Sequence, residues 1–435
     1  MGQPIGPGRA RRLAQATAVD TRPLRHSRDF RLLWAGQLVS LLGRQITTVA
    51  IPFQVYSLTG SALALGALGA VQVVPLVLFG FTAGALADRV DRRRVLLATN
   101  LLLATCSALL ALGALTGSPQ VWTVFALAGL IAALGAVDQP ARSATVPNLV
   151  PRSMLPAAVA LMFGIFQITL VAGPALGGLI IGHAGLSVAY ICDVVSFSAA
   201  IASVALIAPQ PPTARGDRRE GPLRSIRTGF SHLRHQRAVV AGFAIDLDAM
   251  IFGMPRALFP VLAARTFGVG PGGLGLLYAA PGVGALLAVL TAGWLSHTRR
   301  LGRVIVIAVI VWGAAITLFG LVGALWLALM LLAIAGAADS VSAISRSTML
   351  QITTPDSLRG RVSATYATVV VGGPYIGDAE AGAVAFAFSP PVSVVSGGLA
   401  CLVGAAAVSL AFPELWDFDS DMAPEVTESR RAVVT

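Results

Sequence analysis

Charged side chains are scarce in this chain, and lysine is absent altogether. Only 12% of the 435 residues are charged, and all 31 basic residues are arginine. A soluble globular protein carries about 25% charged residues, so about half of the surface charge that such a protein needs is missing. This composition excludes an ordinary soluble enzyme, a disordered chain and a soluble nucleic-acid-binding protein, in spite of a net charge of +11.

Residues that hold metals or form disulfides are also few. The three cysteines lie singly in apolar runs, so neither a disulfide framework nor a metal site is predicted. There are only five histidines, and no metalloprotease, phosphate-binding or nucleophile-elbow motif occurs. We therefore expect no catalytic residues, no metal and no cofactor. The polar, arginine-rich first 28 residues contain no apolar segment typical of a cleavable signal peptide.

Long apolar runs dominate what is present. Hydrophobic residues make up 56% of the chain, and a helix needs about 20 apolar residues to cross a bilayer. Twelve runs meet this requirement, and we expect each to form a transmembrane helix in an all-α membrane protein. They are residues 32–56, 62–86, 95–116, 121–140, 155–182, 186–208, 239–263, 274–296, 303–323, 325–345, 362–387 and 391–413.

One long polar connection divides the twelve runs into two sets of six. The predicted domains are an N-terminal tail (1–28), a first bundle (29–208), a linker (209–238), a second bundle (239–413) and a C-terminal tail (414–435). Within the linker, residues 221–237 alternate leucine, isoleucine and phenylalanine with arginine, which predicts an amphipathic helix on the cytoplasmic membrane surface. A plain tethering helix is the alternative.

The arginines predict the orientation of the chain. With the N-terminus inside, 28 of the 31 arginines fall on the cytoplasmic side and only Arg265 falls outside, while Arg44 and Arg256 lie within runs. Both termini are therefore expected in the cytoplasm of a multi-pass protein of the cell membrane. The basic charge is then a topology signal and a partner for anionic lipid headgroups, and no nucleic-acid partner is expected.

The two halves repeat one another. Arg142-Ser143 follows the fourth run and Arg346-Ser347 follows the tenth, and in both copies a proline comes nine residues after the arginine. Gly84 and Gly293 form a second echo, each close to an arginine-rich turn. Repeats of this kind are common in transporters, whose substrate site lies between the repeats near the membrane midplane.

A glycine, an aspartate and several arginines follow the second run. The segment Gly84-Ala-Leu-Ala-Asp88-Arg89-Val-Asp91-Arg92-Arg93-Arg94 resembles the loop signature Gly-x-x-x-Asp-Arg-x-Gly-Arg-Arg of the major facilitator superfamily, with aspartate replacing the second glycine. The resemblance implies a gating loop at the cytoplasmic ends of the bundles, formed by Gly84, Asp88, Arg89, Arg92 and Arg93. Asp88 would pair there with arginines across the bundle interface. Plain positive-inside charge is the alternative.

The fifth run contains Gly173-Pro174-Ala-Leu-Gly177-Gly178, which resembles the antiporter motif of proton-coupled exporters. Its glycines would allow a neighbouring helix to approach closely, and ordinary helix packing explains them equally well. Longer stretches, among them Gly275 to Pro281 and Gly377 to Gly382, resemble the enterobactin-exporter-like branch of the superfamily, close to macrolide efflux proteins. The resemblance covers nearly all of residues 29–413. It implies the fold and export, and it leaves the substrate open.

Ionisable residues inside the runs are the candidate functional residues. Each costs at least about 2.5–3.5 kcal/mol at the middle of the bilayer. Spans 1, 4, 7 and 10 line the cavity in the superfamily, so the resemblance implies that the cavity and proton-coupling residues are Arg44, Asp246, Asp248 and Asp339. Asp246 and Asp248 point to different sides of one helix, so only one of them can face the cavity.

We expect Asp246 or Asp339 to carry the coupling proton, with Arg44 restraining its charge. The other intramembrane charges are Asp193, Arg256, Asp378 and Glu380. The alternative for these groups is a set of static ion pairs. Arg44 would then pair with an acid of the opposite half, and Arg256 with Asp193 or Glu380.

These features together predict a monomeric, proton-coupled exporter of a small organic molecule that works by alternating access. The substrate is a siderophore or an amphipathic drug. A transporter of lysophospholipids or other metabolites with the same fold is the alternative within transport. A channel or a membrane enzyme is the alternative from another class, but neither a repeated filter segment nor a nucleophile beside a carboxylate occurs in the sequence.

Overall fold

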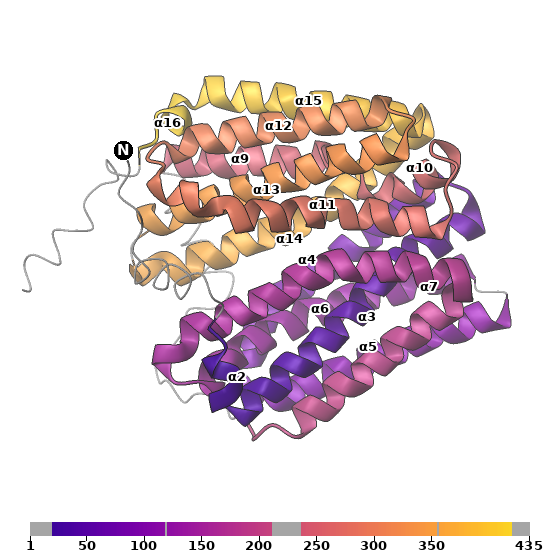
Figure 1. The fold of residues 1–435 in the computed structure, drawn as a ribbon, viewed down its shortest axis with the longest axis vertical. Helices are drawn as coiled ribbons and strands as arrows, with labels where there is room; N and C mark the ends of the chain where they lie inside the picture. The colour runs from indigo at the N-terminus through magenta and orange to yellow at the C-terminus, as the bar shows by residue number, and fades with distance from the viewer. Residues whose placement is uncertain (1–19, 118–119, 211–235, 355, 420–435) are drawn as a thin grey trace, which may run out of the picture.

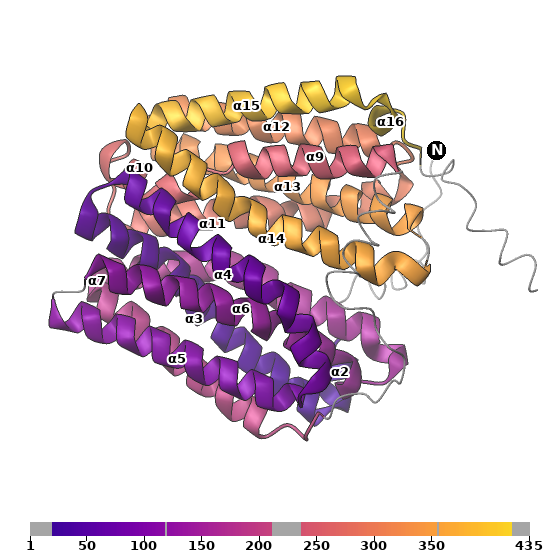
Figure 2. The ribbon, with the colours of Figure 1, turned by 180° about the vertical axis from the view of Figure 1, so that it is seen from behind.

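In the computed structural model, two bundles of long helices lie side by side (Figures 1 and 2). The structure describes residues 20–117, 120–210, 236–354 and 356–419. The first bundle contains α2 (Arg22–His26), α3 (Arg28–Thr59), α4 (Ala62–Arg89), α5 (Arg92–Thr116), α6 (Val121–Leu149) and α7 (Leu155–Ala205). The second contains α9 (Arg237–Phe252), α10 (Phe259–Arg265), α11 (Pro271–Thr291), α12 (Leu301–Leu321), α13 (Leu325–Thr353), α14 (Asp356–Ala387), α15 (Pro390–Ala411) and α16 (Pro413–Trp416).

Ten helical segments of the described chain are long and apolar enough to span a membrane. One of them, Arg152–Ala205, holds two predicted spans, because α7 continues through Gly185 with a break at that residue. Gly185 has a φ of 85°, a left-handed conformation that glycine adopts without a steric penalty. The 32 residues of α14 form a further long helix. The arrangement is that of an all-α membrane protein and is consistent with twelve spans.

The seventh predicted span is interrupted. α9 ends at Phe252, and the chain passes Gly253 and Pro255 into a short 3-10 helix, Arg256–Leu258, before α10 begins. Proline cannot donate a backbone hydrogen bond, which explains the break. The eighth span likewise ends in a 3-10 helix, Ala292–His297. The predicted amphipathic helix of residues 221–237 falls almost wholly outside the described residues.

The packing is that of a protein in lipid. Large apolar side chains point outward, among them Leu410 with 82% and Trp122 with 74% of the side chain exposed. Polar and small residues lie inside, and they include Asn100, Ser342 and Asp246, each fully buried. Close helix contacts through small residues are typical of membrane bundles. In lipid no hydrophobic effect drives apolar side chains inward, so helices associate through close packing.

The bundles approach each other most closely at the end of the molecule where α10 lies, whereas α2 and α16 lie at the other end (Figures 1 and 2). At the α10 end, Arg265 donates a hydrogen bond of 3.3 Å to the carbonyl oxygen of Gly60 in the opposite bundle. At the other end, Arg237 pairs with Glu414 and Arg303 with Asp417, and both pairs stay within the second bundle.

Candidate functional site

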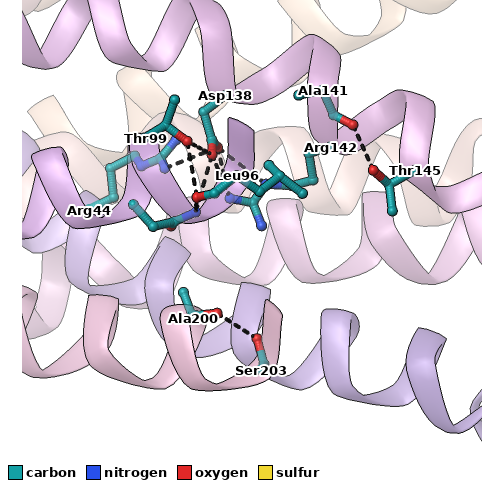
Figure 3. A network of polar contacts seen from close by, with 10 residues as sticks. Arg44, Leu96, Thr99, Asp138, Ala141, Arg142, Thr145, Ala200 and Ser203 are labelled. Carbon is teal, nitrogen blue, oxygen red and sulfur yellow. Dashed lines mark hydrogen bonds and ion pairs between the residues drawn. The ribbon is translucent and has the colours of Figure 1, made fainter. Parts of the chain in front are cut away.

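The first bundle holds a buried carboxylate between two arginines (Figure 3). Asp138 on α6 is 1% exposed, and Arg142, one turn later on the same helix, binds it through two nitrogens, with the shortest distance 2.8 Å. Arg44 on α3 approaches the same carboxylate at 3.6 Å. Thr99 on α5 donates a further hydrogen bond of 2.9 Å. The buried negative charge of Asp138 is thus compensated, which a low-dielectric interior requires.

A second acid of the first bundle has a different environment. Asp193 on α7 is 2% exposed and accepts hydrogen bonds of 2.7 Å from Thr47 on α3 and from Ser107 on α5. Ser196, one turn along α7, donates a third at 3.3 Å. Hydroxyl groups on three different helices therefore surround this carboxyl group.

The second bundle has its own buried arginine. Arg346 on α13 is 3% exposed and forms an ion pair of 2.7 Å with Asp246 on α9, which is fully buried. Arg346 also donates a hydrogen bond of 2.9 Å to Ser342. Asp339 lies two turns earlier on α13, half-buried, and interacts electrostatically with Arg346 and Asp246. Among the described residues Asp339 has no direct hydrogen bond or ion pair.

The predicted cavity residues therefore do not form one constellation. Arg44 pairs with Asp138 of its own bundle, so a pair with an acid of the opposite half is wrong for this conformation. Asp246 pairs with Arg346, and Asp339 interacts with Arg346 only at longer range. Asp248 points away from this cluster and lies against Gly404 on α15.

Two arginines were misplaced by the positive-inside count. The count predicts that Arg142 and Arg346 lie in cytoplasmic loops, but α6 continues to Leu149 and α13 to Thr353, so both arginines are helical and buried. They occupy equivalent positions of the internal repeat. The prediction also missed Asp138, although its spacing of four residues from Arg142 places both on one helix face.

Two further intramembrane charges, Arg256 and Asp378, pair with each other near the α10 end. Arg256 forms an ion pair of 3.3 Å with Asp378 on α14, and the backbone amide of Ala257 donates to the same carboxylate at 3.1 Å. The prediction that Arg256 pairs with Asp193 or Glu380 is therefore wrong. Glu380 is half-buried on α14.

The described part of the gating loop contacts only the first bundle. Arg92 donates a 3.0 Å hydrogen bond to the carbonyl oxygen of Ala144 on α6, and Arg93 donates to carbonyl oxygens at the end of α7. Asp91 caps α5 by accepting from the amide of Arg93 at 2.9 Å. The side chains of Gly84, Asp88 and Arg89 lie outside the described residues, so the proposed pairing of Asp88 across the interface stays a prediction.

The motif of the fifth run lies at a junction of three helices. Gly173 and Gly177 face Gln45 and Ile46 of α3. Gly178 faces the other bundle, where an added Cβ would lie 2.5 Å from the carbonyl oxygen of Pro271 and 2.7 Å from the Cα of Gly275. The backbones of α7 and α11 therefore meet through glycines at the α10 end of the bundle interface.

Two bundles of long apolar helices with buried charge clusters define a multi-pass α-helical membrane protein, and solved transporters share the fold. A nucleoside transporter, NupG, superposes with a TM-score of 0.68 at 12% identity, covering 90% of this chain and 100% of that chain. A POT family transporter in complex with 5-aminolevulinic acid gives 0.71 at 12% identity, covering 90% and 97%. At these identities the likeness concerns the fold alone.

The chain belongs to the transmembrane secretion effector family of the major facilitator superfamily, whose model matches residues 18–432. The enterobactin exporter EntS of Escherichia coli is 30% identical over 410 residues, covering 92% of this chain and 95% of the relative. EntS of Shigella boydii matches equally well over the same coverage. The predicted superfamily and its enterobactin-exporter-like branch are confirmed. The protein is a membrane exporter, which acts in a lipid bilayer on a small molecule, and not an enzyme.

Proposed function

We propose that this protein exports a siderophore or an amphipathic drug in exchange for protons, by alternating access between the two bundles. The substrate class draws support from the relatives, which are named as enterobactin exporters. The monomer is the transporting unit, and both termini lie in the cytoplasm. The N-proximal α2 and the C-proximal α16 lie at the same end of the molecule, as expected when both termini are on one side of the membrane (Figure 1). The excess of arginine in the connections supports the cytoplasmic side.

The observation that carries proton coupling is the cluster in the second bundle. The buried cation Arg346 pairs with Asp246 at 2.7 Å and also acts electrostatically on Asp339, without direct contact. Among the described residues this cluster has one positive and two negative charges, which is costly in a membrane interior, and binding of one proton makes it neutral. Asp246 holds Arg346 directly at 2.7 Å, so Asp339 is the group that takes up and releases the proton.

The arrangement of the bundles supports alternating access. Contacts between the bundles include Arg265 with Gly60 and Gly178 with Gly275, both at the α10 end. With the termini in the cytoplasm, this end faces outward and is closed. The structure then corresponds to the inward-facing state, from which substrate is loaded.

The substrate is tested by deleting the gene and measuring both the intracellular metabolites and the drug tolerance of the cells. Retention of a siderophore inside the deletion strain supports siderophore export, whereas increased drug sensitivity with unchanged siderophore levels supports drug export. The strain complemented with the intact gene is the control. A deletion strain that neither retains a siderophore nor becomes more sensitive to drugs contradicts both substrate classes.

A further inference from the structure

We propose that Asp193 is a second proton-binding site of the transporter, located in the first bundle, and that Arg44 replaces the proton when it is released. This inference rests on the proposed proton coupling and adds a site to it. The proton-binding group is a carboxyl held by hydroxyls instead of by a cation.

The first argument is the contrast between two equally buried acids. Asp138 is served by Arg142 at 2.8 Å and also by Arg44 at 3.6 Å. Asp193 is served by the hydroxyls of Thr47, Ser107 and Ser196. No arginine of the described chain lies within 4.0 Å of Asp193. A buried carboxylate without a nearby cation is costly, and a bound proton removes that cost while the hydroxyls serve the neutral acid as donors and acceptors.

The second argument is the position of Arg44. Its guanidinium lies 6.0 Å from the centre of the Phe197 ring, one turn from Asp193 on α7, and Thr47 is one turn along α3 from Arg44. Arg44 acts electrostatically on both Asp138 and Asp193. Its Nε has no hydrogen-bond partner among the described residues. Asp138 keeps Arg142 when Arg44 leaves, so Arg44 can move to Asp193 without exposing an unpaired charge.

The exchange balances in charge. In the proposed protonated state the O–H bond of the Asp193 carboxyl is intact, and Arg44 lies 3.6 Å from Asp138, as in this structure. When that bond breaks, the proton leaves to water on the side of Arg44, whose side chain is 29% exposed, and Arg44 pairs with the new carboxylate. Among the described residues, the other ionisable group that interacts with Asp193 is Tyr190 on α7, whose hydroxyl donates a 2.6 Å hydrogen bond to Gln54 on α3. On α5 the contact is the neutral Ser107.

Infrared difference spectroscopy on the purified full-length protein in liposomes tests the site without any substrate. The parent protein carries Asp339→Asn, because Asp339 is the proposed coupling carboxyl and would give a band of its own. In this parent we expect a C=O band of a protonated carboxylic acid that disappears as the medium is made alkaline, and we expect Asp193→Asn to remove that band. Asp378→Asn, which changes a buried acid paired with Arg256 at 3.3 Å, is the matched control and should leave the band in place. A band that survives Asp193→Asn, or a parent protein without such a band, overturns the proposal.

Milder variants keep the test decisive if Asp193→Asn does not fold. Thr47→Val and Ser107→Ala each remove one hydroxyl contact, and each should shift the frequency of the band. Arg44→Gln removes the cation that stabilises the carboxylate, so the band should persist in alkaline medium where the parent loses it. An unchanged frequency in both hydroxyl variants, or release unaffected by Arg44→Gln, contradicts the proposed site. A wild-type protein that shows the band but no transport driven by a pH gradient would contradict the proposed function and not the proton-binding site.

Discussion

At the residue scale, each bundle contains a buried arginine that binds a buried aspartate. Arg142 uses Nε and Nη2 together on Asp138, and Arg346 joins Asp246 of α9 to Ser342 of its own helix. A guanidinium presents several donors in one plane and so satisfies a carboxylate at two points. The two clusters differ in their balance of charge among the described residues, because Asp138 lies between two arginines whereas Arg346 pairs with Asp246 and acts on Asp339 at longer range. The first cluster is therefore a structural anchor, and the second is suited to proton exchange.

Breaking the anchor should destabilise the protein. Arg142→Met leaves Asp138 buried with only the more distant Arg44, and removal of one partner of a buried ion pair costs about 3–5 kcal/mol. We expect a clear fall in the melting temperature in detergent. Arg22→Gln removes an exposed ion pair with Asp20 and is the control, for which no measurable change is expected. Equal melting temperatures of Arg142→Met and the wild type would contradict the anchoring role.

At the element scale, breaks and close contacts shape the α10 end. Gly253 and Pro255 end α9 and lead into the segment in which Arg256 pairs with Asp378. α7 and α11, from opposite bundles, meet through Gly178 and Gly275. The closure of this end therefore depends on the absence of side chains at Gly178 and Gly275, which lets the backbones of α7 and α11 approach each other closely.

A side chain at this contact should separate the bundles. In Gly178→Val the new Cβ would meet the backbone of α11 at 2.5 Å, so we expect the α10 end to open and transport to fall at least tenfold. The opening is measured as a longer distance between spin labels placed at Leu58→Cys and Gly270→Cys in a background without the native cysteines. Gly182→Val, one turn away, is the control, since its nearest neighbour is 3.9 Å from an added Cβ. Unchanged label distances in Gly178→Val would show that this contact does not hold the end closed.

The apolar runs of the sequence predict the helices of this fold. They do not predict that α6 and α13 continue past these runs through the charged residues Arg142 and Arg346. An arginine at the edge of an apolar run looks like a loop residue unless its partner is known, which is why Arg142 and Arg346 were placed in loops. The pair of Arg142 with Asp138 was readable from its four-residue spacing. The pair of Arg346 with Asp246 joins residues 100 positions apart, and no local pattern reveals it. The break of the seventh span at Pro255 was likewise hidden by continuous hydropathy.

At the scale of the whole molecule, the two ends differ. The α2 and α16 end carries the arginine-rich connections, and the α10 end carries the closed contact between the bundles (Figure 2). Moving Arg142 and Arg346 into helices takes two arginines from the 28 counted on the cytoplasmic side, and the remaining excess still predicts the same orientation.

Cysteine labelling from outside intact cells tests this orientation. Gly270→Cys precedes α11 at the α10 end, where an added Cβ meets no atom within 4 Å, and we expect an impermeant maleimide to modify it. Ser153→Cys is exposed at the opposite end and should be spared until the membrane is opened with detergent. The three native cysteines are removed first. The reverse labelling pattern would place the termini outside.

The most direct test of proton-coupled export is transport into proteoliposomes in which the cytoplasmic side of the protein faces the medium and the lumen is made acidic. The substrate is the compound retained by the deletion strain, and enterobactin is tried first. We predict that the wild type accumulates it only while the pH difference lasts. Asp339→Asn should lose this accumulation and keep exchange of substrate down its own gradient, while Asp20→Asn, outside the bundles, behaves like the wild type. Full gradient-driven accumulation by Asp339→Asn would contradict the assignment of the coupling proton to Asp339, and accumulation by the wild type without any pH difference would contradict proton coupling itself.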